Sequence, residues 1–144
     1  MTIAAVVQRT ERQAFLLEDS GENPTLPHQL ILKKVPKRVA KIAYRNWHYL
    51  GMNGFLSSIN YGVYDYQAVF SGAISFGIPN AKNIRGLFEQ KTQSDYLELT
   101  RLALSPSLRP NSESRVISVA LKLIIKQFTN LKGVVSYADT EQNH

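Results

Sequence analysis

One stretch of the chain, residues 96–139, constrains the fold more than any other. It reads as an apolar strand (YLELTRLALS), a polar turn (PSLRPNSESR), an amphipathic helix (VISVALKLIIKQF) and a second apolar strand (VVSYAD). Two strands joined through a helix predict a βαβ unit. A turn that leads from a strand into a helix presents free backbone N–H groups at the positive end of the helix dipole. The stretch therefore predicts a site for a phosphate-bearing ligand.

Upstream of this unit the sequence predicts a strand (29–33), a helix (36–48) and a β-hairpin (56–63 and 67–77), separated by segments that contain Gly, Pro or Asp. An antiparallel meander followed by a βαβ unit gives an α+β fold, with a mixed, mostly antiparallel sheet flanked by helices. We expect one domain over residues 1–144, with an N-terminal extension up to residue 29 and a cofactor-binding unit at 96–139. The expected buried stripe of the first helix comprises Val39, Ala40, Ile42, Ala43 and Trp47.

Composition narrows the class of protein. The chain has 144 residues, 44% of them hydrophobic, which is enough for a core without disulfides. It has no cysteine, so disulfides, thiolate metal sites and a cysteine nucleophile are excluded. It also has no signal peptide pattern and no apolar run near the roughly 18 residues of a membrane span. We therefore expect a cytoplasmic protein that does not associate with membranes.

Positive charge is concentrated in one short segment, within a chain of net charge +6. Three of these cations recur at the spacing of a single helix face, and aromatic residues follow them. A basic face with aromatic residues at its end suits a phosphate backbone with an exposed base nearby. The alternative is a solvated helix face with the tryptophan in the core. The candidate DNA-binding residues are Lys33, Lys34, Lys37, Arg38, Lys41 and Arg45, and the aromatics are Tyr44, Trp47 and Tyr49.

The turn before the second helix contains the candidate cofactor-binding residues. Pro110 cannot lie inside a helix, so the helix begins after it, with Asn111 or Ser112 as the N-cap. The turn has neither a G-x-G-x-x-G nor a G-K-[ST] signature, so an ordinary capped helix is the alternative. The candidates are Arg109, Asn111, Ser112, Glu113, Ser114 and Arg115.

Arg101 interrupts the apolar strand that precedes this turn. Strand alternation puts it on the same face as Leu97, Leu99 and Ala103. A guanidinium on an apolar face needs a partner, because burial of an unpaired charge is expensive. Arg101 could also bind an anion beside the turn, or lie at the strand end and extend to water.

Two further residues are candidates for chemistry. Asp139 ends the last strand, where ligands of such sheets collect, and could act as a base, a metal ligand or an acceptor for a base edge. A turn-initiating role is the alternative for Asp139. His48 lies at the aromatic end of the basic segment, and a structural role is the alternative for it.

The βαβ unit resembles the cofactor half of the GNAT acetyltransferase fold, in which the turn after the fourth strand holds the acetyl-CoA pyrophosphate. This chain has RPNSESR where GNAT proteins carry a glycine-containing turn. A narrower resemblance fits the whole order of motifs. NWHYLG, ELTRLAL, NSESR and VVSYAD, in this order and spacing, are similar to the phage Mom family of DNA-modification proteins.

This resemblance implies conversion of adenine in duplex DNA to its N6-methylcarbamoyl form, which protects phage DNA from restriction. It implies acetyl-CoA and iron as cofactors. The residues that match the family's catalytic positions are His48, Tyr49, Arg101 and Asp139. The strand end formed by Leu102, Ala103 and Leu104, together with the turn around Ser114, would bind the coenzyme.

The family pattern continues past Asp139 with a G-x-x-Y-x-A-x-N-W-like stretch, so we expect this chain to lack a C-terminal segment. Two other functions are compatible with the residues. One is an ordinary GNAT N-acetyltransferase that acts on a small amine or a protein. The other is a basic DNA-binding domain without enzymatic activity.

Overall fold

The computed structural model describes residues 23–48, 57–79 and 96–136. In chain order, the elements are η2 (Pro27–Gln29), β1 (Ile31–Lys34), α2 (Lys37–Trp47), β2 (Ile59–Tyr64), β3 (Phe70–Gly77), β4 (Tyr96–Leu104), α4 (Ser112–Gln127) and β5 (Gly133–Val135).

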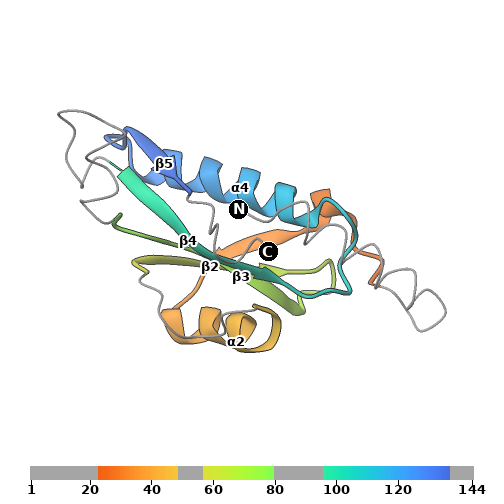
Figure 1. The fold of residues 1–144 in the computed structure, drawn as a ribbon. Helices are drawn as coiled ribbons and strands as arrows, with labels where there is room; N and C mark the ends of the chain where they lie inside the picture. The colour runs from red at the N-terminus through yellow and green to blue at the C-terminus, as the bar shows by residue number, and fades with distance from the viewer. Residues whose placement is uncertain (1–22, 49–56, 80–95, 137–144) are drawn as a thin grey trace, which may run out of the picture.

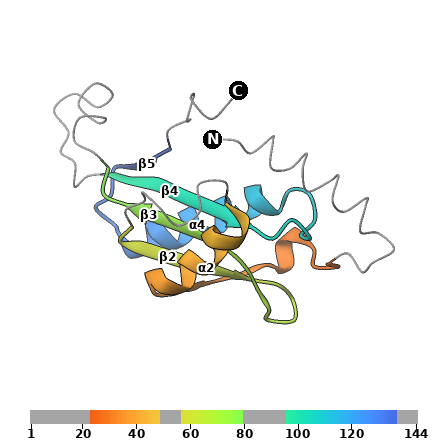
Figure 2. The ribbon, with the colours of Figure 1, turned by 60° about the horizontal axis from the view of Figure 1, so that its bottom comes forward.

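The strands form one five-stranded sheet in the order β1-β2-β3-β4-β5. The first four strands pair antiparallel, and β5 pairs parallel to β4. Helix α2 covers one face of the sheet and α4 covers the other (Figure 1). The same arrangement of sheet and helices is seen after rotation (Figure 2). The predicted α+β class is therefore confirmed, as are the β-hairpin and the βαβ order of β4, α4 and β5. No helix of the described residues is long and apolar enough to cross a membrane.

The two faces of the sheet have different cores. The α4 face buries large side chains, as the α4 pattern predicted: Val116, Ala120 and Ile124 of the helix pack on strand residues such as Ile74 and Phe76. The α2 face is built from small residues, namely Ala40, Ala43, Ala73 and Ala103, around the single large side chain of Tyr44. Alanines on both surfaces let the helix approach the sheet closely, so Tyr44 is fully buried between them.

Helix α2 is rotated relative to the predicted stripe. Its buried face is Ala40, Ala43 and Tyr44, with Trp47 stacked on Phe70 at a ring separation of 6.3 Å. This is the i, i+3, i+4, i+7 pattern of a helix that packs on a sheet. The prediction for Ile42 was wrong, because that side chain is 45% exposed. Tyr44, which was expected to stand near an exposed base, lies in the core instead.

A β-bulge changes the orientation of side chains along β4. Ser75 of β3 pairs with Arg101, and Phe76 pairs with Leu99, so Thr100 is an extra residue without a strand partner. The Thr100 hydroxyl donates to the carbonyl oxygen of Ser75 at 3.1 Å. Across the bulge the alternation of side chains between the two faces shifts by one residue.

Because of the bulge, Arg101 does not share a face with Leu97 and Leu99, contrary to the prediction from the sequence. Leu97 and Leu99 lie on the α4 face, in the apolar core. Arg101 and Ala103 lie on the α2 face, since Ser75, the partner of Arg101, bonds to Tyr44 of α2. Strict alternation placed all four on one face, and it failed because it allowed no extra residue in the strand.

Candidate functional site

The hydroxyl of Tyr44 joins α2 to the centre of the sheet. Ser75 donates to Asn60 Oδ1 at 2.6 Å, so the Ser75 oxygen is left to accept the Tyr44 proton, also at 2.6 Å. The carbonyl oxygen of Arg101 is a second acceptor, 3.3 Å from the Tyr44 hydroxyl. Burial raises the pKa of Tyr44 well above its usual value, so the phenol stays protonated and acts as a donor. The bonds thus fix the main chain of β4 at Arg101 relative to α2.

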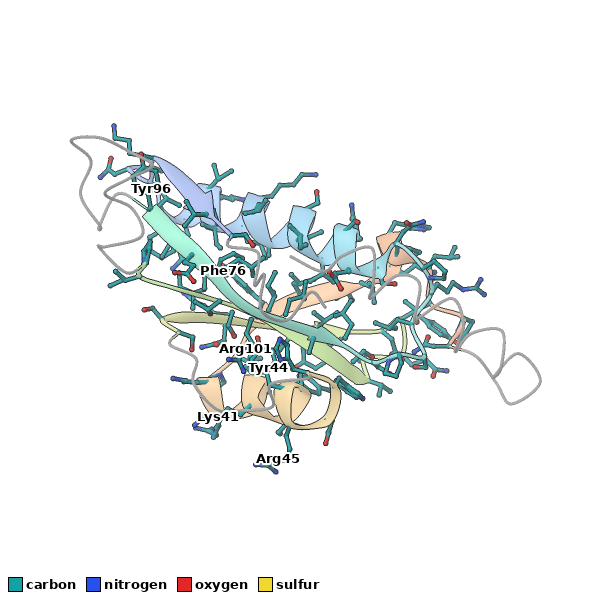
Figure 3. The ribbon with its side chains drawn as sticks, viewed as in Figure 1. Lys41, Tyr44, Arg45, Phe76, Tyr96 and Arg101 are labelled. Carbon is teal, nitrogen blue, oxygen red and sulfur yellow. The ribbon has the colours of Figure 1, made fainter. Side chains whose placement is uncertain are left out.

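Arg101 is buried, with 6% of its surface exposed, inside β4 rather than at its end. The alternative in which it extends from the strand end to water is therefore wrong. Figure 3 shows Arg101 beside Tyr44 on the α2 side of the sheet. A buried guanidinium carries a positive charge in a medium of low dielectric constant, where its field is strong. This position suits the recognition or stabilisation of negative charge.

His48 directly follows α2 as its C-cap residue. Its backbone N–H donates to the carbonyl oxygen of Tyr44 at 3.2 Å, and its ring lies edge-on to the Tyr44 ring with centroids 6.0 Å apart. Lys37, Tyr44 and His48 follow at intervals of seven and four residues, along one side of the helix, whereas Lys41 and Arg45 lie toward its outer side. Helix α2 thus carries cations on its outer side, and on its inner side Tyr44 contacts the ring of His48 and the main chain of Arg101.

The predicted basic surface is only partly continuous. Lys41 and Arg45 project from α2 away from the sheet (Figure 3), and Arg38 is exposed beside them. On β1, Lys33 lies on the α2 face, with its Nζ 5.9 Å from the centre of the Tyr64 ring. Lys34 pairs with Tyr61, whose side chain belongs to the α4 face, so Lys34 points away from the other cations.

Glu98 is a residue that sequence reasoning missed. Its neighbours Leu97 and Leu99 pack into the α4-side core, so Glu98 lies on the α2 face of β4. It is partly buried, and this burial raises the pKa of its carboxyl group. Alternation alone puts residues 98 and 101 on opposite faces, and only the bulge reveals that they share one.

The N-terminus of α4 has an unusual cap. Asn111 is the N-cap residue, as predicted, but it has a left-handed backbone (φ 73°) and makes no side-chain cap bond. The hydroxyl of Ser112 instead donates back to the carbonyl oxygen of Arg109 at 2.7 Å. The Nε atoms of Arg109 and Arg115 are buried and have no hydrogen-bond partner among the described residues. Two unpaired guanidinium nitrogens at a helix N-terminus favour an anion there.

The remaining candidate residues of the βαβ unit differ in exposure. Ser114 is exposed in the first turn of α4, whereas Glu113 is buried. Leu102 and Leu104 contact the α4-side core, and Ala103 faces α2. Strand β5 pairs with β4 only at residues 96–98, so over residues 99–104 no described strand pairs with this edge of β4.

An apolar cavity of about 590 Å³ lies on the α4 side of the point where β4 and β5 separate. Its walls come from β3 and β4, from one side of α4, and from β5 with the segment before it. They include Phe76, Leu99, Leu121, Leu131 and Val134. The β4 edge without a described strand partner, most walls of the cavity and the α4 N-terminus belong to the same βαβ unit.

Tyr49 and Asp139 lie outside the described residues, so their predicted roles stay predictions. Within residues 23–48, 57–79 and 96–136, no three His, Cys, Asp or Glu side chains come close enough to hold a metal ion.

A comparison with protein-family models matches residues 29–144 to the Mom protein family. Because this match covers most of the chain, the chain belongs to the Mom protein family. Membership indicates a phage DNA-modification enzyme. Among curated proteins, no match was found.

The structure predicts different effects of hydroxyl removal at two buried tyrosines. Tyr44→Phe leaves Ser75 without its donor and should lower the free energy of unfolding by about 1–2 kcal/mol. Tyr61→Phe is the matched control, because the Tyr61 hydroxyl is buried without a hydrogen-bond partner among the described residues. Its removal should be neutral or stabilising. Urea denaturation measures both, and equal losses for the two variants would contradict the assigned role of the Tyr44 hydroxyl.

Proposed function

We propose that this chain converts adenine in duplex DNA to its N6-methylcarbamoyl form with acetyl-CoA, and so protects phage DNA from restriction. The observation that carries the proposal is helix α2, which carries a row of cations on its outer side and, on its inner side, contacts His48 and the main chain of the buried Arg101 through Tyr44. Such a row suits a DNA backbone, and a buried cation beside it suits chemistry on a base. Family membership supports the DNA-modification part of the proposal.

The βαβ unit fits acetyl-CoA by the chemistry of its donors. The unpaired Nε atoms of Arg109 and Arg115, with the backbone N–H groups of the first turn of α4, would hold the pyrophosphate. The edge of β4 at Leu102, Ala103 and Leu104, which pairs with no described strand on the β5 side, would offer main-chain groups to the amide-bearing arm of the coenzyme. The apolar cavity beside this edge favours the less polar parts of that arm. When bound, the coenzyme would supply an activated two-carbon unit, and the additional nitrogen of the methylcarbamoyl group would come from a second donor.

The target adenine must leave the base stack before its N6 can reach the side chains of this face. Lys37, Lys41 and Arg45 would neutralise phosphates along the strand that carries the base. Arg101 would stabilise negative charge that develops near the reacting atoms, because it is already oriented and desolvated. His48 stands where it could orient the base or exchange a proton with it.

Iron stays a prediction from the family resemblance. The described residues supply no set of three His, Cys, Asp or Glu ligands for iron, and the roles proposed for Arg101 and His48 do not depend on a metal.

Mass spectrometry of DNA tests the proposal. The chain is expressed in bacteria that carry a plasmid, and the plasmid is digested to nucleosides. We expect a deoxyadenosine species with the mass of the methylcarbamoyl adduct, and we expect the Arg101→Ala variant to lose it. Unmodified adenine in the presence of folded protein would contradict the proposal. Acetylation of proteins or small amines without DNA modification would favour an ordinary acetyltransferase.

Acetyl-CoA binding should depend on the guanidinium groups at the start of α4. Arg115→Gln removes one unpaired donor and should weaken binding by about tenfold or more, since a charged hydrogen bond contributes about 1.5–3 kcal/mol. Lys122→Gln is the control, because Lys122 is an exposed cation farther along the same helix. Isothermal titration with acetyl-CoA measures both variants. Equal affinity for the wild type and Arg115→Gln would exclude the proposed anion site.

DNA binding should depend on the outer side of α2. The double variant Lys41→Gln/Arg45→Gln should weaken duplex binding and reduce the slope of log K against log salt by about two, one for each phosphate that is no longer neutralised. The control pair Lys122→Gln/Lys126→Gln removes the same charge from the exposed side of α4. Fluorescence anisotropy at several salt concentrations gives the slopes. If both pairs lower the slope equally, the attraction is a property of net charge and not of α2.

A further inference from the structure

Glu98 is the one acidic side chain of β4, and it shares the α2 face of the sheet with Arg101. Its partner in β3 is Gly77, and its partner in β5 is Val135. Neither neighbour can donate a side-chain hydrogen bond or offer a charge. Glu98 also occupies the last pair between β4 and β5, next to the point where the two strands separate.

The bulge at Thr100 is what brings the two charged residues to one face. Without the extra residue, Glu98 and Arg101 would point to opposite sides of β4. With it, they are consecutive side chains on the α2 face, followed by Ala103. β-Bulges are frequent beside active sites, because they redirect a side chain within a regular sheet.

The carboxylate of Glu98 is poorly compensated for a partly buried charge. It makes no hydrogen bond and no ion pair among the described residues, and burial alone accounts for the raised pKa. Burial disfavours the charged form of this carboxyl group, and no described residue compensates for that cost. A carboxylate without partners and with raised proton affinity is suited to accept a proton from a substrate.

We propose that Glu98 is a catalytic residue that accepts the proton of the exocyclic amine of the target adenine. This inference rests on the proposed function. As N6 forms its bond to the carbon of the acetyl-derived donor, the N–H bond breaks and its electron pair stays on nitrogen. The proton passes to a carboxylate oxygen of Glu98, and the carbon–sulfur bond of the thioester breaks with both electrons, which leave on the thiolate of the coenzyme. Arg101, on the same face, stabilises the developing negative charge.

The Glu98→Gln variant tests this role, because it keeps the shape of the side chain and removes the proton acceptor. Modified adenine per plasmid should fall at least about 100-fold, in the range of general-base catalysis. Glu98→Asp keeps the charge on a shorter side chain and should lose less. DNA and acetyl-CoA affinities of Glu98→Gln should equal those of the wild type.

Stability separates a catalytic role from a structural one. The folded-state pKa of Glu98 is raised, so its contribution to stability is favourable at low pH and is lost as the pH rises through that pKa. At neutral pH the uncharged amide of the Glu98→Gln variant should therefore preserve or raise the Tm. Low activity with preserved Tm and binding supports the proposal. Reduced binding or a reduced Tm would assign Glu98 a structural role instead.

Two other outcomes are distinguishable. Modification by Glu98→Gln within about threefold of the wild type overturns the role of Glu98 and leaves the proposed function in place. A wild-type chain that leaves adenine unmodified overturns both.

Discussion

One extra residue in β4 determines the chemistry of the sheet. Thr100 has no partner in β3, and its hydroxyl bonds to the main chain of Ser75, which stabilises the bulge. N-terminal to this point, the leucines of β4 face α4, and C-terminal to it, Arg101 faces α2. If the strand were regular, either Arg101 would enter the apolar core under α4 or the leucines would face α2. The bulge allows one strand to serve both an apolar core and a polar site.

The two faces of the sheet are held together by different interactions. Under α4, large aliphatic and aromatic side chains interlock and supply most of the buried apolar surface. Under α2, alanines bring the helix close to the sheet, and Tyr44, Ser75 and Asn60 exchange hydrogen bonds in place of apolar contacts. A buried polar network contributes less net stability than well-packed apolar side chains of the same volume, but it fixes geometry. This is the face that also carries Arg101, Glu98 and the basic side of α2.

The helices and strands were predictable from the sequence. Which side chains of α2 and β4 lie on which face of these elements was not. Apolar runs, Pro36 and Pro110 located the strands and helices within a few residues. The exposure of Ile42 was missed, because the predicted stripe included apolar residues all around the helix, whereas the buried face follows the spacing i, i+3, i+4, i+7 from Ala40. The face of Arg101 was missed, because a bulge leaves no signal in the alternation of side chains. Glu98 was missed for the same reason, since its relation to Arg101 exists only through the bulge.

The turn before α4 shows why the lack of glycine does not argue against an anion site. A glycine in such turns supplies a backbone with positive φ. Here Asn111 adopts that conformation, at φ 73°, and asparagine is among the few other residues that tolerate it. With this cap the asparagine side chain makes no bond to the helix, so it does not compete with a ligand for the first N–H groups. Arg109 and Arg115 then place charge at the site, which a glycine-rich turn lacks. The turn thus differs from a glycine turn in sequence. It still has a cap residue with positive φ and first-turn N–H groups that no cap side chain occupies, as a turn that binds phosphate requires.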